Sequence, residues 1–443
     1  MKLVYGVKDK PKFGQLIVFA FQQLLAILAA TIAVPMIVGN GMSQSAALFG
    51  AGVGTIVYLL FTKFRSPVFL GSSFAFLGSM FAAFAGAVSV EAGYAGLIIG
   101  ALFAGLVYVV IALVVKFGGV KWIDRLMPPV VIGPTVAIIG LSLAGNAVGD
   151  ALRFAENDGS AYVMSTHGWV GFICALVTLC VVMLCSVYGK KMTKLIPFVI
   201  GILAGYVVAA IFTVIGNATG NDALKIIDFS LFGNMQWVPD FTFLKAAKGF
   251  AEIDGKYIAT IAVAYIPVAF VVFAEHIADH KNLSSIIDHE LLEDPGLHRT
   301  LLGDGVGSMA GAVFGGCPNT TYGESVGCVA ITGNASVITI LATAIMAIVI
   351  SFFGPFVTFL STIPSCVMGG VCITLYGFIA VSGLKMIQKV DLGENSNLFT
   401  VSVILIAGIG GMTLKIGAVT LTEVACALIL GIITNLILNR KKN

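Results

Sequence analysis

Asn319-Thr-Thr-Tyr-Gly-Glu-Ser-Val-Gly327 is a polar, glycine-rich stretch inside an otherwise apolar chain. Its acid, Glu324, has a counterpart in Glu275, which lies within Ala274-Glu-His-Ile-Ala-Asp-His280 on another apolar segment. A carboxylate at membrane depth is costly, and such residues usually mark an ion or substrate path. Two carboxylates on two interrupted segments therefore predict a transport site.

The composition indicates a membrane protein. Mean hydropathy is +1.02, 58% of the residues are hydrophobic and 11% are charged. Apolar runs long enough to cross a bilayer as helices recur along the chain, for example at 16–38, 95–115, 171–187, 196–215 and 337–353. We therefore expect an all-α polytopic membrane protein with about fourteen spans, not a soluble enzyme with an anchor.

The basic residues indicate orientation more than partners. With both ends inside, most of the 25 Lys and Arg residues fall in inside segments, among them Lys190, Lys191 and Lys194. The positive-inside bias therefore predicts a multi-pass protein of the cytoplasmic (plasma) membrane with both termini cytoplasmic. The polar stretch 216–256 is expected outside, with a short surface helix near 241–248, and 279–299 is expected as an inside loop. Basic residues do not cluster with aromatic ones, so we expect the lipid bilayer, not nucleic acid, as a partner.

The polar landmarks of the two halves resemble each other. Ser72-Ser-Phe-Ala75 and Thr320-Thr-Tyr-Gly323 both read hydroxyl, hydroxyl, aromatic, small, and the segments 29–35 and 274–280 align at a nearly equal offset. Seven spans per half, an odd number, would give the halves opposite orientations, which predicts two inverted seven-span repeats. The alternative to an internal repeat is that these short apolar segments resemble each other by chance.

The segments near 70–76 and 317–324 carry glycine or proline at or just before their starts. We expect each to be extended first and helical afterwards, because an extended backbone at membrane depth is tolerated only where it is buried or lines a cavity. The half-helix that follows would aim its free N–H groups and positive dipole end at the cavity. Carbonyl oxygens of a substrate could accept from these groups.

The acids and histidines at 275–280 differ in what they predict. Glu275 and Asp279 share one helix face through i, i+4 spacing. Glu275 follows a run without charge and is expected to be functional, whereas Asp279 faces either the site or cytoplasmic water. We expect His276 to make a structural hydrogen bond and His280, with Lys281, to reach water at the end of the helix.

Glu324 has no Lys or Arg near it in the sequence. Desolvation without a cationic partner favours the protonated carboxyl, which a proton-coupled carrier needs. A capping carboxylate at the start of a half-helix is the alternative. The spacing of His276 and His280 would allow metal ligation, but the string H-E-x-x-H does not occur, and we expect neither metal nor cofactor. The eight cysteines lie in apolar segments and are expected to pack between helices.

Five strings of the chain resemble the nucleobase–ascorbate transporter family, in particular its bacterial uracil-permease branch. They are Gly71-Ser-Ser-Phe-Ala-Phe76, Ala274-Glu-His-Ile277, Asp294-Pro-Gly-Leu-His-Arg299, Pro318-Asn-Thr-Thr-Tyr-Gly-Glu324 and Leu375-Tyr-Gly377. The family signature, an acid or amide followed by x-x-G-x-x-x-x-T, is matched by Glu324-Ser-Val-Gly-Cys-Val-Ala-Ile-Thr332. The resemblance covers nearly the whole chain.

The resemblance implies that the chain folds into two domains. A core domain would comprise residues 1–125 and 257–354, and a gate domain residues 126–256 and 355–443. The implied activity is uptake of a nucleobase, which in this branch is uracil, together with a proton as coupling ion, by alternating access between core and gate. A homodimer is also implied.

The resemblance also implies site residues. Glu275 and Glu324 match the substrate-binding carboxylates of the family. It also implies contacts from Phe74, Tyr322, Gly323, Ala30 and Tyr376. We add Ser73 as an expected contact, because it lies beside Phe74 in the sequence. The residues expected to take part in proton coupling are Glu324, Asp279 and Glu275.

Two departures from the uracil-permease pattern bear on the substrate. Ser325 stands where the pattern has Asn, and Asp279 stands where it usually has His, so that the acid is more like the purine-type branch. Transport of xanthine or urate is therefore the nearest alternative. An anion exchanger or channel of similar architecture would favour a fixed positive charge, and the sequence places none near Ser73 or Glu324. An intramembrane metalloenzyme is the third alternative.

Overall fold

Apolar helices make up most of the computed structural model, which describes residues 3–119, 128–190, 192–416 and 419–439. The helices of the first half are α1 (Phe13–Val38), α2 (Gln44–Phe61), α3 (Leu77–Ala85), α4 (Val90–Gly118), α6 (Pro129–Ser142), α7 (Ala144–Ala151), α8 (Thr166–Tyr188), α9 (Met192–Leu195) and α10 (Pro197–Thr219). Those of the second half are α11 (Thr242–Gly249), α12 (Gly255–Ile287), α13 (Leu297–Gly315), α14 (Gly323–Thr332), α15 (Val337–Ile350), α16 (Gly354–Thr362), α17 (Ser365–Ile387), α18 (Asn395–Ile409) and α19 (Glu423–Leu438).

Short elements connect these helices. The strands form three two-stranded pairs, β1 (Leu70–Ser72) with β4 (Asn319–Thr321), β2 (Glu156–Asn157) with β3 (Tyr162–Val163), and β5 (Leu414–Ile416) with β6 (Val419–Leu421). The single turns are η1 (Phe74–Phe76), η2 (Asp222–Leu224), η3 (Phe229–Asn234) and η4 (Leu292–Gly296).

The described helices confirm a polytopic, mostly helical membrane protein. Seven of them, and α6 with α7 taken as one, are long and apolar enough to cross a membrane, and α15 with α16 makes a ninth candidate that is bent by 82°. Fourteen spans are reached only when the shorter or more polar helices α3, α13, α14, α18 and α19 are counted as well. The count of fourteen stays a prediction.

Two sequence-based boundaries can now be compared with the structure. The short helix expected near 241–248 is present as α11. The inside loop expected from residue 279 onward is wrong at its start, because α12 continues to Ile287. Leu283 and Ile287 are buried and extend the packed face of α12 beyond the acids and histidines.

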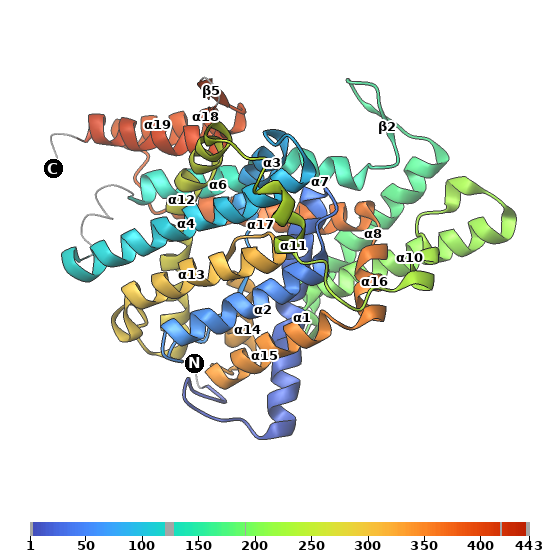
Figure 1. Ribbon diagram of the computed structural model, residues 1–443, viewed down its shortest axis with the longest axis horizontal. Coiled ribbons are helices and arrows are strands. Elements are labelled where there is room, and N and C mark those ends of the chain that lie inside the picture. Colours follow the sequence, from blue (N-terminus) through green and yellow to red (C-terminus); the bar gives the residue numbers. More distant parts are fainter. Residues whose placement is uncertain (1–2, 120–127, 191, 417–418, 440–443) are drawn as a thin grey trace.

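The helices pack mainly within two groups. One contains α1, α2, α4, α13 and α15, with α12 against α4, and the other contains α6, α7, α8, α10 and α17, with α18 and α19 against α6. Figure 1 shows α8 and α10 at one end of the long axis and α18 with α19 along another edge. The division into core and gate at the residue limits given above stays a prediction.

The two interrupted segments meet at the centre of the molecule. β1 pairs antiparallel with β4, with Leu70 opposite Thr321 and Ser72 opposite Asn319. The predicted order, extended first and helical afterwards, is confirmed in both, since η1 and α3 follow β1 and α14 follows β4. The antiparallel pairing of matching strings is what two repeats of opposite orientation would produce.

Buried side chains satisfy the backbone around this crossing. Thr55 Oγ1 accepts from the Leu70 amide at 2.9 Å and lies 3.2 Å from the Leu70 carbonyl. Asn319 donates its side-chain amide to the Gly50 carbonyl at 3.0 Å. Since unpaired backbone groups cost several kcal/mol in a bilayer, these bonds make an extended segment possible at this depth.

The N-terminal segment is attached to the end of α14. The Val4 and Tyr5 amides donate to the Gly333 carbonyl at 2.8 and 3.2 Å, and the Ala335 amide donates to the Tyr5 carbonyl at 2.9 Å. Ser336 Oγ donates to the Asp9 carbonyl at 2.6 Å. The beginning of the chain thus fixes the turn between α14 and α15.

A loop–loop ion pair joins the end of α2 to the segment before α13. Arg65, just after α2, donates to Asp294 in η4 at 2.5 Å. That hydrogen bond lowers the pKa of the Asp294 carboxyl below its usual value. Both side chains are about half exposed, so the pair orders the loops more than it stabilises the fold.

Glycine lets α2 and α13 approach closely. A Cβ added at Gly307 would lie 2.7 Å from the Gly54 carbonyl oxygen and 2.8 Å from Leu70 Cδ1. We therefore expect Gly307→Ala to destabilise the protein by about 1–3 kcal/mol through overpacking, measured as a lower melting temperature in detergent. Gly14→Ala is the matched control, because a Cβ there meets nothing within 4 Å. Equal melting temperatures for both variants would contradict this account of the helix pair.

Candidate functional site

A cavity of about 420 Å³ lies beside the crossing of the two interrupted segments. Residues of η1, β4, α12 and α14 line one side, and residues of α6, α10 and α17 line the other. The sequence-predicted residues that line it are Ser73, Phe74, Glu275, Asp279, Tyr322, Gly323 and Glu324. Of the remaining predicted contacts, Ala30 and Tyr376 are buried and lie outside this lining.

Three carboxylates face the same cavity. Glu275 and Asp279 come from adjacent turns of α12, and Glu324 comes from the first turn of α14. Among the described residues, Glu275 and Glu324 form no ion pair and no hydrogen bond to another residue's side chain. Their oxygens are therefore free to accept N–H groups of a ligand.

The start of α14 supplies donors next to these acceptors. Gly323 is the first residue of α14, and a Cβ added there would meet nothing within 4 Å. The first N–H groups of a helix have no intrahelical partner and lie at its positive end. The backbone N–H group at Gly323 can therefore donate to a carbonyl oxygen of a ligand, as expected from the sequence.

Asp279 lines the cavity and does not simply end the helix in cytoplasmic water. Its carboxylate accepts a hydrogen bond from Thr321 Oγ1 at 2.7 Å and contributes to the cavity lining. Thr321 is the last residue of β4. The bond therefore connects α12 to the crossing and leaves the second oxygen of Asp279 available.

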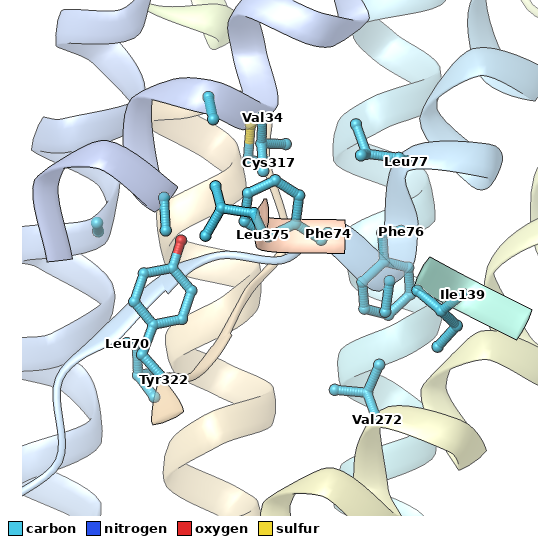
Figure 2. Packing of buried hydrophobic residues seen from close by; sticks show 14 of the residues in the cluster. Val34, Leu70, Phe74, Phe76, Leu77, Ile139, Val272, Cys317, Tyr322 and Leu375 are labelled. Atoms are coloured by element: carbon cyan, nitrogen blue, oxygen red, sulfur yellow. The ribbon is translucent and has the colours of Figure 1, made fainter. Parts of the chain in front are cut away.

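Two aromatic residues, Tyr322 and Phe74, line the cavity and are held in place by different contacts. Tyr322 donates its hydroxyl to the Ser72 carbonyl at 2.7 Å, and its ring lies against Gly71, where a Cβ would collide with the ring. The ring of Phe74 lies edge-on to Tyr376, with centroids 5.8 Å apart. Figure 2 shows Tyr322 on one side of Phe74 and Phe76 on the other. Tyr376 thus supports Phe74 from behind.

The two histidines have structural partners. His276 is hydrogen-bonded through Nδ1 to Asp304 at 2.6 Å and through Nε2 to Thr300 at 3.0 Å, which confirms the expected structural role. The expectation that His280 reaches water is wrong, since it is fully buried and bonded to the Tyr58 hydroxyl at 2.7 Å. The reason is that α12 continues for two more turns, so that His280 is not at the helix end.

Asp304 is a buried acid that the sequence analysis missed. It lies on α13 in Gly303-Asp-Gly305 and is hydrogen-bonded to His276 of α12. Its position in an apolar, glycine-rich helix was the available signal, since buried acids are rare unless paired. The described residues contain no group of three or more His, Cys, Asp or Glu placed to hold a metal ion.

Ser325 connects three segments behind the site. Its hydroxyl accepts from Gln23 Nε2 of α1 at 2.7 Å and from the Phe69 amide at 3.1 Å. The side chain is fully buried and is absent from the cavity lining. At this position, where the resembling pattern has Asn, the chain uses a small hydroxyl to hold α14 in place.

Lys194 is a cation that the sequence did not place at the site. It belongs to α9, is exposed, and lines the cavity together with Leu195 and Pro197. Leu195 packs against Ala26 of α1 and Cys328 of α14. The segment 194–197 therefore borders the mouth of the cavity.

The Permease family (Xan_ur_permease) matches residues 14–417 of the sequence. The chain belongs to this family of permeases. It is 40% identical to the uracil permease of Bacillus caldolyticus over 99% of this chain and 95% of that protein. Identity to the uracil permeases of Bacillus subtilis (strain 168) and Escherichia coli (strain K12) is 38% and 35%, over 100% and 98% of this chain and 96% and 93% of theirs. Relatives and family are permeases, not enzymes.

Solved structures support the fold of the permease. The transmembrane domain of a cyanobacterium bicarbonate transporter, BicA, aligns with a TM-score of 0.58 at 16% identity, over 97% of this chain and 98% of that one. Murine Solute Carrier 26 family member A9, an anion transporter in the inward-facing state, aligns with a TM-score of 0.63 at 12% identity, over 98% and 69%. At these identities the likeness concerns the fold alone.

The role of Ser325 can be tested by removing its hydroxyl. Ser325→Ala would leave the Gln23 amide and the Phe69 N–H without an acceptor, and we expect a loss of about 1–3 kcal/mol in stability. Thermal unfolding of the purified permease measures it. Ser382→Ala is the control, because Ser382 lines the cavity and its hydroxyl has no partner among the described residues. If Ser325→Ala melts like this control, Ser325 does not hold α14.

Proposed function

We propose that this permease is a proton-coupled symporter for a nucleobase, with uracil as its substrate, and that it works by alternating access. The observation that carries the proposal is the meeting of two unpaired carboxylates, Glu275 and Glu324, with the free N–H groups at the start of α14. The curated relatives that are 35–40% identical over nearly their full length are uracil permeases, which supports the same substrate class.

The edge of a uracil ring matches these groups. The ring presents two N–H donors and two carbonyl acceptors in one plane. Carboxylates accept from N–H, and backbone N–H groups donate to carbonyl oxygens, so that each ligand group finds an opposite partner. Phe74 and Tyr322 contribute aromatic surface to the same cavity, on which a flat ring can pack.

The shape of the cavity supports an inward-facing state under the predicted orientation. Its mouth is bordered by Lys194, in a segment that the positive-inside pattern places in the cytoplasm. On the other side of Phe74, the space between α3, α6 and the start of α19 amounts to only about 10 Å³. Movement of the α6–α10 and α17–α19 group against the other would close one side and open the other.

Purine transport is the second candidate, and Asp279 is the observation that favours it. Its carboxylate lines the cavity and adds a third acceptor beside Glu275 and Glu324. A larger ring with more N–H groups could use it. An inorganic anion fits less well, because three acids and a single exposed lysine line the space. A thermal-shift panel of pyrimidines, purines and anions tests these alternatives, since the bound ligand raises the melting temperature by mass action.

The first functional prediction concerns Glu275. Glu275→Gln keeps the shape but replaces an acceptor oxygen by a donor amide, which would face a ligand N–H. We expect a loss of about 1–3 kcal/mol in uracil binding, or roughly 5- to 150-fold in Kd, measured by equilibrium binding to the purified protein. Near-normal affinity in this variant would remove Glu275 from the site.

The second functional prediction concerns the coupling ion. If Glu324 or Asp279 carries the proton, uptake rises as external pH falls and collapses with a protonophore. With Glu324 as carrier, Glu324→Gln exchanges bound substrate across the membrane but does not accumulate it. If Asp279 is a relay, Asp279→Asn loses the pH dependence and Asp279→His keeps transport with a shifted pH profile. Uptake that depends on sodium and is indifferent to pH would contradict proton coupling.

A further inference from the structure

A second cavity, of about 370 Å³, lies between α1, α3 and α7. It shares no lining residue with the central cavity. Ile37, which lines it, is about three turns further along α1 than Ala26 of the central cavity. We call it the outer cavity and define it by Phe81, Asn146, Asp150, Arg153 and Tyr162.

Polar side chains reach the outer cavity from adjacent turns. Asn146 and Asp150 are i, i+4 on α7 and therefore share one face, and Arg153 follows one turn later. Asp150 and Arg153 form no ion pair with each other, and within the described ranges none of the three side chains has a hydrogen-bond partner. An acceptor, a forked donor and an amide thus remain available in one space.

The floor between these side chains is open backbone. Gly145 and Gly149 are also i, i+4 on α7 and line the cavity. A Cβ added at Gly145 would meet nothing within 4 Å, and one at Gly149 would meet only the Tyr162 hydroxyl, at 3.8 Å. Glycine here therefore leaves room that the packing of the protein does not use. Phe81 and Tyr162 add aromatic surface from α3 and β3.

We propose that the outer cavity is a second binding site for the planar heterocycle that the central site takes. The carboxylate of Asp150 accepts a ring N–H, the guanidinium of Arg153 donates to ring carbonyl oxygens, and the flat ring lies over the glycines. The chemistry required is a flat ring with neighbouring N–H and C=O groups, which an inorganic anion lacks. The inference rests on the proposed function for the identity of that ring.

The position of the outer cavity, next to both helix groups, suits a site that holds substrate between transport cycles. α3 continues the segment that carries Ser73 and Phe74, and α7 packs against α17, which carries Tyr376. A ligand in the outer cavity touches both helix groups on the side away from Lys194. It is held there while the central site faces the other way, and it raises the local concentration of substrate for the next opening.

Equilibrium binding of radiolabelled uracil to the purified full-length protein tests the second site. We expect two classes of site in the unsubstituted protein, a tight one and a weaker one. The double variant D150N/R153Q should lose the weaker class and keep the Kd of the tight class within twofold. Gly145→Leu should do the same by filling the space, and should fold normally because the position is open.

Two controls separate this inference from the proposed function. E275Q should lose the tight class and keep the weaker one, and E293Q/K256Q, which removes the same charges from exposed positions outside both cavities, should keep both. A single class that E275Q abolishes and that D150N/R153Q and Gly145→Leu leave unchanged would overturn the second site alone. Loss of both classes in D150N/R153Q would also overturn it. No uracil binding by the unsubstituted protein would instead overturn the proposed function.

Discussion

The pairing of β1 with β4 is the interaction on which the other features of this permease depend. Two extended segments that lie far apart in the sequence share their backbone hydrogen bonds near the centre of a membrane-spanning bundle, where water cannot supply them. Because the strands run antiparallel, the helices that follow them, α3 and α14, leave the crossing in different directions. The turn η1 and the first turn of α14 line the same cavity, and the start of α14 places free N–H groups there without any side chain.

The acids are placed by the same arrangement. Asp279 is held by Thr321 at the end of β4, and Glu324 follows two residues after Tyr322, whose hydroxyl is bonded to Ser72. Behind the site, Ser325 and His276 connect α14 to α1 and α12 to α13. These buried hydrogen bonds hold the helices together behind the site, whereas Glu275 and Glu324 face the cavity without a side-chain partner among the described residues.

The extended segments and several residues of the candidate site could be predicted from the sequence, because they depend on residues that are close together in it. Breakers ahead of hydroxyl–aromatic strings predicted the extended segments, and the uncharged run before Glu275 singled out this acid, which lines the cavity. What could not be predicted depends on contacts between distant segments. His280 is buried against Tyr58, which lies more than two hundred residues earlier in the sequence, and one oxygen of Asp304 is hydrogen-bonded to a histidine from another helix. Lys194 reaches the cavity only because α9 folds back onto α1 and α14.

The attachment of the N-terminal segment to Gly333 and Ala335 has a practical consequence for handling the protein. The far end of α14, the helix that carries Glu324, is fastened to the first residues of the chain. A bulky fusion partner placed ahead of Leu3 would strain that attachment and disturb the candidate site through α14. An affinity tag or fluorescent reporter belongs after α19, where the described chain ends in an exposed helix terminus.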